Sequence, residues 1–117
     1  MIVQDVVVLR EAADDLETGY VFYEKREKGV GDYFYDNLIA DIESLIIFAG
    51  IHTLVERLYR MLSKRFPYAI YYQISDQMDY VVAILPMKRD PVWIITACDP
   101  GLSPEKRDHG FKKRKKQ

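Results

Sequence analysis

The sequence predicts an α+β domain of order β-αα-βββ, in which a mainly antiparallel four-stranded sheet carries an α-helical hairpin on one face. Two observations predict this class. The spacing of apolar residues changes from strand-like to helical and back again, and glycines stand at the changes. The 117 residues, with 49% apolar and 30% charged side chains, also suffice for one domain with a single modest core.

The first strand and the first helix follow directly from apolar spacing. The segment from Ile2 to Leu9 contains a continuous β-branched run, which is typical of a strand covered on both faces. Apolar residues then fall at helical spacing from Glu11 to Lys28, and acids occupy the first turn, where the helix dipole favours them. Gly29 is expected to take the left-handed conformation that ends this helix.

A second helix is predicted directly after the turn GVGDYF. Asp32 is its expected N-cap and Gly50 its expected end. Its apolar stripe consists of Phe34, Leu38, Ile42, Leu45 and Ala49. So short a connection between two helices predicts an antiparallel αα-hairpin.

Three consecutive strands are predicted at about residues 56–64, 67–75 and 79–86, forming an antiparallel meander. The polar stretch SDQMD is the expected hairpin turn, with Asp76 and Asp79 as ordinary turn residues. Pro86 should end the last strand, because proline cannot donate to a β-ladder.

The C-terminal part of the sequence does not predict a single type of secondary structure. PVWIITAC is compatible with a short helix or with a fifth strand, and the residues from Asp99 onward, rich in Pro, Gly and charge, predict a flexible basic tail. The expected division is therefore a domain at residues 1–98 and a tail at residues 99–117.

Composition excludes several classes of protein. No apolar run is long enough to span a bilayer, and the N-terminus lacks the charged region of a signal peptide. Cys98 is the single cysteine, and His52 and His109 have no metal-ligand spacing, so neither a disulfide nor a metal site is expected. His52 is expected to be solvated in a loop. These features suggest a cytoplasmic protein.

The net charge of −1 conceals an asymmetry. Residues 1–56 carry twelve acids and four bases, a net −8, whereas the remainder carries thirteen bases and six acids, a net +7. Pairs of cations flank the last two strands: Lys64 with Arg65 before them, and Lys88 with Arg89 after them. They form either a site for a polyanion or ordinary solvated strand ends that deter aggregation.

The order and spacing of five segments resemble the RelE/ParE superfamily, the toxins of bacterial type II toxin–antitoxin (plasmid stabilisation) modules. The matching residues are Ala13 with Asp15 and Leu16, then YEKREKGVGDYF, the helical stripe, KRFPYAIYYQI with VVAIL, and KRDPVW. The resemblance covers residues 3–94. It implies a toxin that inhibits growth, that a cognate antitoxin neutralises, and that acts either by ribosome-dependent mRNA cleavage or by inhibiting DNA gyrase.

The resemblance also implies roles for individual residues. For a metal-independent mRNA endonuclease, which needs no cofactor, Lys64, Arg65 and Arg89 would stabilise charge on the phosphate. Arg57, Arg60 and Lys88 would contact nucleic acid or a protein target, as would Tyr71, which strand alternation places on the sheet face away from the helices. Trp93 would stack on a base or close the end of the sheet. Arg57 and Arg60 are equally compatible with outward-facing strand positions.

Three functions remain open on the sequence. A pI near 6.1 is low for an RNase that binds the ribosome, which favours a protein target such as gyrase. The same cations are nevertheless compatible with mRNA cleavage. A nontoxic relic that retains the fold only as a protein-interaction module is the third alternative.

Overall fold

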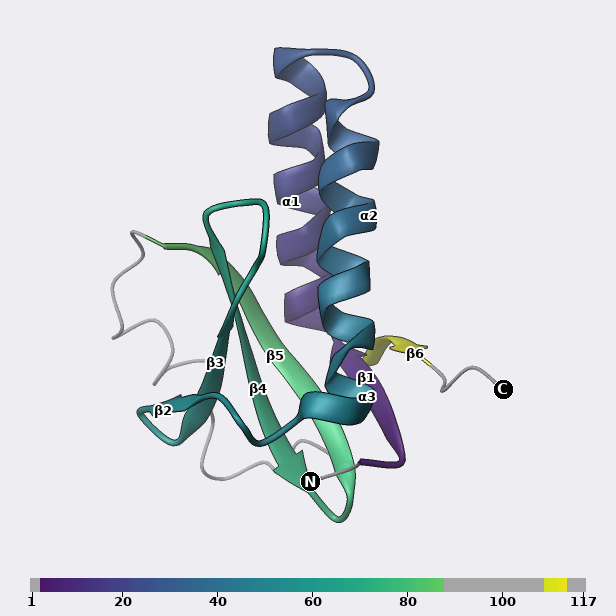
Figure 1. Cartoon of the computed structure of the whole chain (residues 1–117). Helices are drawn as coiled ribbons and strands as arrows, with labels where there is room; N and C mark the ends of the chain where they lie inside the picture. The colour runs from purple at the N-terminus through teal and green to yellow at the C-terminus, as the bar shows by residue number, and fades with distance from the viewer. Residues whose placement is uncertain (1–2, 88–108, 114–117) are drawn as a thin grey trace.

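A computed structural model describes residues 3–87 and the backbone of residues 109–113. Its helices and strands follow the order β1 (Asp5–Leu9), α1 (Arg10–Arg26), α2 (Val30–Glu43), α3 (Leu45–Phe48), β2 (Thr53–Val55), β3 (Leu58–Leu62), β4 (Tyr68–Ser75), β5 (Met78–Pro86) and β6 (His109–Lys113). The α1–α2 hairpin packs on one face of the sheet, and its tip extends beyond the sheet (Figure 1).

The sheet is mixed and has six strands in the order β2-β3-β4-β5-β1-β6. Strands β3 to β5 form the predicted antiparallel meander, and β2 extends it by one antiparallel strand. Strand β1 pairs with β5 in parallel, since the helical hairpin carries the chain back before the meander begins. The α+β class is therefore confirmed, and the sheet is mainly antiparallel as predicted, whereas the predicted number of four strands is wrong.

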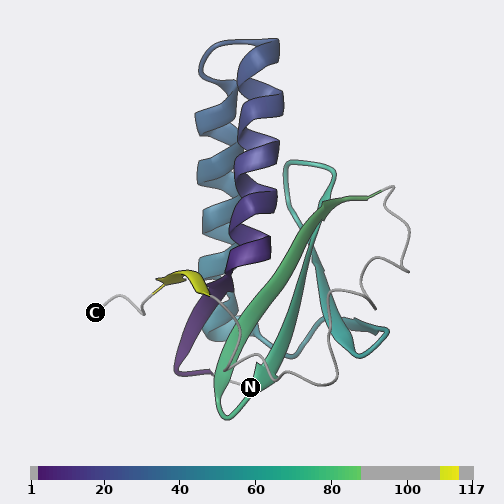
Figure 2. The same ribbon diagram turned by 180° about the vertical axis from the view of Figure 1, so that it is seen from behind.

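Two strands, β2 and β6, were not predicted from the sequence. The strand expected at residues 56–64 is β3, and β2 precedes it as an additional strand. Glu56 and Arg57 form the tight turn between the two, with φ of 50° and 73°. Strand β6 pairs with β1 inside the stretch expected to be a flexible tail (Figure 2). Main-chain pairing stabilises both short segments, and local apolar spacing does not reveal it. The domain boundary at residue 98 lies outside the described residues and stays a prediction.

Helix α1 and the start of α2 lie near their predicted limits, but α2 ends at Glu43, and the separate short helix α3 takes the place of the rest of the helix that was predicted to reach Gly50. The caps also differ. Gly29 has the expected left-handed φ of 93°, yet it is the N-cap of α2, so the prediction that Asp32 caps this helix is wrong. The carboxylate of Glu24 in α1 instead accepts hydrogen bonds from the backbone N–H groups of Gly29 and Gly31. One helix thus caps the next, which fixes the hairpin.

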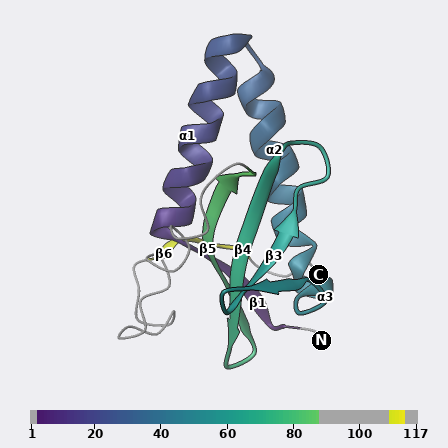
Figure 3. The ribbon, with the colours of Figure 1, turned by 90° about the vertical axis from the view of Figure 1, so that its left-hand side faces the viewer.

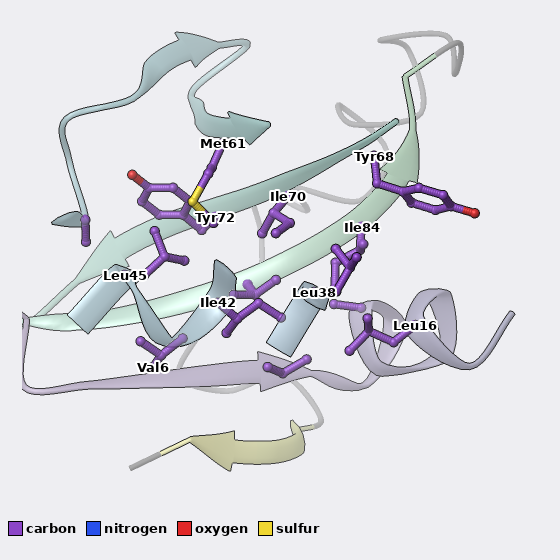
Figure 4. Packing of buried hydrophobic residues seen from close by; sticks show 14 of the residues in the cluster. Val6, Leu16, Leu38, Ile42, Leu45, Met61, Tyr68, Ile70, Tyr72 and Ile84 are labelled. Atoms are coloured by element: carbon purple, nitrogen blue, oxygen red, sulfur yellow. The ribbon is translucent and has the colours of Figure 1, made fainter. Parts of the chain in front are cut away.

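The core on the helical side contains side chains from both layers, and Figure 4 shows Leu16, Leu38 and Ile42 with Ile70 and Ile84. Strand β1 is buried along all five residues, as its continuous apolar run predicts. A second buried cluster includes Tyr71, Tyr80 and Val82 on the face of the sheet turned away from the helices. Figure 3 shows β4 and β5, the strands that carry these residues, side by side. Strand alternation therefore places Tyr71 as expected.

Candidate functional site

The described cations of the predicted site occupy three different places. Lys64 and Arg65 are exposed in the loop between β3 and β4, while Arg57 lies in the β2–β3 turn. Lys64 is seven positions after Arg57 in the sequence, which corresponds to roughly 20 Å along an extended strand. Arg60 pairs across the sheet with Tyr71 on the face away from the helices. Lys88, Arg89 and Trp93 lie outside the described residues, so a single phosphate-binding patch stays a prediction.

One groove is formed where α2 and α3 meet the end of β3. Its volume is about 260 Å³. The residues that line it are Asp41, Ser44, Phe48, Ile51, His52, Met61, Leu62 and Lys64. Of the predicted site residues that the structure describes, Lys64 alone lines this groove.

Asp41 attaches the loop that carries Lys64 and Arg65 to helix α2. Its side chain is only 6% exposed, and its carboxylate accepts hydrogen bonds from the Ser63 hydroxyl at 2.7 Å and from the Lys64 backbone N–H at 3.4 Å. The Lys64 backbone is therefore held at the mouth of the groove, although its side chain remains in solvent. A buried acid at the end of an otherwise apolar helical stripe is the sequence signal for this contact.

His52 is attached to the core by a buried tyrosine. Its Nδ1 lies 2.5 Å from the hydroxyl of Tyr72, which also accepts a hydrogen bond from the backbone N–H of Gly50 at 2.9 Å. Burial lowers the pKa of His52 and raises the pKa of Tyr72 to about 12, so both groups are neutral at pH 7. His52 lies in a loop as predicted, but it is only partly solvated, because it is half-buried against Tyr72.

Replacing Tyr72 by phenylalanine is expected to reduce the free energy of unfolding by about 1–3 kcal/mol. The change removes the hydroxyl that accepts from Gly50 and contacts His52. Urea denaturation measures the loss, and the neighbouring Tyr71→Phe is the matched control. No side-chain hydrogen bond of Tyr71 is found within the described residues, so that control is expected to change stability by less than about 0.5 kcal/mol. Equal losses in the two variants would contradict this role.

Asp79 is the group that sequence reasoning missed most completely. The prediction that it is an ordinary turn residue is wrong, because it is the second residue of β5, is 0% exposed, and neither carboxylate oxygen has a hydrogen-bond partner among the described residues. Burial raises its pKa to about 8. Asp79 and Val81 are two positions apart in β5, so their side chains lie on the same face of the strand. Because Val81 packs against the helices, this spacing is the sequence signal that places the Asp79 side chain on the helical side of the sheet.

Comparison with known proteins supports the fold. No protein-family model matches the sequence, and no curated protein matches it. Among solved structures, the chain is similar to a chain of the chromosomal ParDE TA system from P. aeruginosa, with a TM-score of 0.66 and 16% identity. The match covers 72% of this chain and 96% of the other. This likeness concerns the fold, and it agrees with the RelE/ParE resemblance of the sequence.

Two further observations apply to the described residues. Within residues 3–87, no helix combines the length and apolarity that crossing a membrane requires. The described part of the chain also contains no group of three or more His, Cys, Asp or Glu side chains placed to bind a metal ion.

Proposed function

We propose that this chain, whose fold is that of the RelE/ParE superfamily, is the toxin of a bacterial type II toxin–antitoxin module. The observation that carries the proposal is the structural match, which covers almost the whole of a chain from a ParDE TA system. The order and spacing of the sequence segments named above support it independently. A cognate antitoxin would neutralise the toxin in the cytoplasm, with a helix along the α1–α2 hairpin and an extended segment against the sheet.

As the mode of action, we favour the inhibition of a protein target such as DNA gyrase. Tight binding to the phosphate backbone requires several neutralising cations in one place. Lys64, Arg60 and Arg57 are instead distributed over a loop, the face of the sheet away from the helices, and a turn. The low net charge of −1 supports the same choice. Ribosome-dependent mRNA cleavage by Lys64, Arg65 and Arg89 is the competing action.

Induction of the chain alone in a bacterial host tests the proposal. We expect growth arrest, relaxed or broken plasmid DNA and intact transcripts, because an inhibited gyrase no longer maintains supercoiling. Primer extension on translated mRNA and gel analysis of plasmid topology are measured in the same cells. Codon-phased cuts in the mRNA that disappear in the Arg89→Ala variant would contradict gyrase inhibition and would support mRNA cleavage as the mode of action.

The partner is tested in the same host. Co-expression of the short reading frame adjacent to this gene is expected to restore growth, and that of an unrelated antitoxin is the control. Normal growth under strong induction of the chain alone would contradict toxicity and would leave a protein-interaction module with the toxin fold.

A further inference from the structure

Exposed apolar side chains concentrate in one short stretch of the chain. Among the described residues, nine large apolar side chains are exposed, and four of them lie within residues 47–54, in α3, the following loop and β2. These four form the edge patch and are Ile47, Phe48, Ile51 and Leu54, with exposed fractions of 49% to 67%. Such a concentration on a small domain marks a surface that another molecule covers.

The edge patch lies on the helical side of the sheet. Leu54 pairs directly with Tyr59 in β3, and residues opposite each other in an antiparallel pair point to the same face. Tyr59 packs against the core on the helical side, where its ring stacks on Tyr72 with 5.1 Å between the centroids. Phe48 of α3 and Ile51 of the loop line the same groove. The patch therefore continues from α3 through the loop to β2.

Strand β2 is an edge strand that lacks the usual protection. It is the first strand in the order of the sheet, and its residues Thr53–Val55 include no charged side chain and no proline. Strand β6, at the opposite edge, contains Lys112 and Lys113 in its sequence, and Figure 1 shows the two edges on opposite sides of the molecule. Lysine and proline are residues that commonly keep an edge strand from pairing with another chain. Of the two edges, β2 is therefore the one at which a further strand can add.

The β2–β3 turn fixes the direction of the backbone groups of β2. Glu56 and Arg57 are the two residues of this turn, and both have the positive φ of a type I′ hairpin. In a two-residue hairpin, the residues that flank the turn, here Val55 and Leu58, exchange hydrogen bonds. The next pair, which contains Leu54, does not, because the two kinds of pair alternate. The N–H and C=O of Leu54 therefore point outward, away from β3.

The charge of the edge patch favours a second copy of the chain as its occupant. Residues 44–55 contain no Asp, Glu, Lys or Arg. His52 is half-buried in this stretch, and its lowered pKa keeps it neutral at pH 7. Two identical surfaces that meet on a two-fold axis place equal charges against each other, so a charged patch would repel itself. An uncharged patch avoids this repulsion, and the adjacent turn carries one charge of each sign, on Glu56 and Arg57.

We propose that two copies of the chain form a symmetric dimer through the edge patch. Their β2 strands pair antiparallel with the two-fold axis at Leu54, so that each Leu54 N–H donates to the Leu54 C=O of the second copy. The two sheets then form one continuous sheet. Phe48 and Ile51 flank the axis and pack on apolar side chains of the second copy. This inference goes beyond the proposed function, because it requires neither toxicity nor an antitoxin.

Sedimentation equilibrium of the full chain tests the dimer. Over about 1–200 µM protein we expect a reversible equilibrium between monomer and dimer with a dissociation constant on the order of 10 µM, because the patch is smaller than a standard interface.

The strand pairing is tested by NMR on a mixture of isotopically labelled and unlabelled chains. We expect a nuclear Overhauser effect between the Hα protons of Thr53 in one copy and Val55 in the other. A two-fold axis at Leu54 places these residues opposite each other as a pair that exchanges no hydrogen bonds, the pair type in which the two backbones lie closest.

Two variants make the test specific. Leu54→Lys places two positive charges together at the axis, and it is expected to raise the dissociation constant of the dimer at least about 100-fold. Val21→Lys is the matched control, because Val21 is an exposed aliphatic residue of α1 outside the edge patch. It is expected to leave the dissociation constant unchanged within about twofold. Both substitutions are at exposed positions, so thermal denaturation should show that both variants stay folded.

Four results would overturn the proposal. They are a chain that remains monomeric at about 200 µM, the absence of the intermolecular Overhauser effect in a dimer, an undiminished dimer in Leu54→Lys, and an equal loss of the dimer in Val21→Lys. A monomeric chain whose Leu54 amide becomes protected on addition of another protein would assign the edge patch to that protein and would likewise contradict the symmetric dimer.

Discussion

The free energy of unfolding of the wild type is expected to fall by about 1.4 kcal/mol per pH unit between roughly pH 5 and pH 8, and replacing Asp79 by asparagine is expected to abolish this fall. In the folded chain burial raises the pKa of Asp79 from 3.8 to about 8. The folded state therefore binds a proton that the unfolded state releases over this range. The stabilisation is complete below about pH 4, the unfolded pKa, and it is lost as the pH rises through the folded pKa near 8.

Urea denaturation of both proteins at a series of pH values measures the effect. The difference between the two curves of stability against pH isolates the effect of Asp79, because every other titrating group is common to both proteins. One of these common groups is His52, whose lowered pKa makes stability rise with pH and so acts in the opposite direction. Asp76→Asn is the matched control, since Asp76 is exposed in the adjacent turn and its φ of 54° suits asparagine. Parallel curves for the wild type and Asp79→Asn would show that Asp79 is ionised in the folded state.

Gly19→Ala is the second large effect, with an expected loss of about 1–3 kcal/mol in the free energy of unfolding. A Cβ atom at Gly19 would lie 2.5 Å from Cζ of Phe34 in α2, well inside van der Waals contact. Phe34 is fully buried and packs against the rings of Tyr23, Phe66 and Tyr68, so it has little room to move. This clash outweighs the gain of about 1 kcal/mol in helix propensity from glycine to alanine.

Thermal and urea denaturation measure the effect of Gly19→Ala against Thr18→Ala, the exposed neighbour in the same helix. The control is expected to be neutral or slightly stabilising, since it changes propensity without a contact. A second change, Phe34→Leu, should recover part of the loss by making room beside residue 19, a non-additive result. A Gly19→Ala protein more stable than the wild type would contradict the close approach of α1 and α2.

Most of the fold was predictable from local pattern. The continuous apolar run of β1, the helical stripes of α1 and α2, and the alternation of β4 and β5 all report burial on one or both faces of an element. The turn at Asp76 and Gln77 was predictable from its polar composition, and both residues have the positive φ of a tight hairpin turn. Periodicity fails at the edges of the sheet, where β2 and β6 exist through main-chain pairing with strands remote in sequence or just beyond a turn.

The candidate site shows the same division. The sequence indicated the cations and the side of the sheet that Tyr71 occupies, and it suggested the RelE/ParE fold. It did not indicate the groove, because the groove combines residues of α2, α3, the following loop and β3. Hydrogen bonds across 20 or more positions of sequence join His52 to Tyr72 and Ser63 to Asp41.

The sequence by itself determined which faces of each element are apolar, and so it determined the layers of helix and sheet, because burial of apolar surface depends on local spacing. The tertiary structure alone decided which strands pair and that Asp79 is buried with no hydrogen-bond partner among the described residues. These features depend on contacts between distant segments, and the environment of a carboxylate or of a backbone N–H follows from what surrounds it in space.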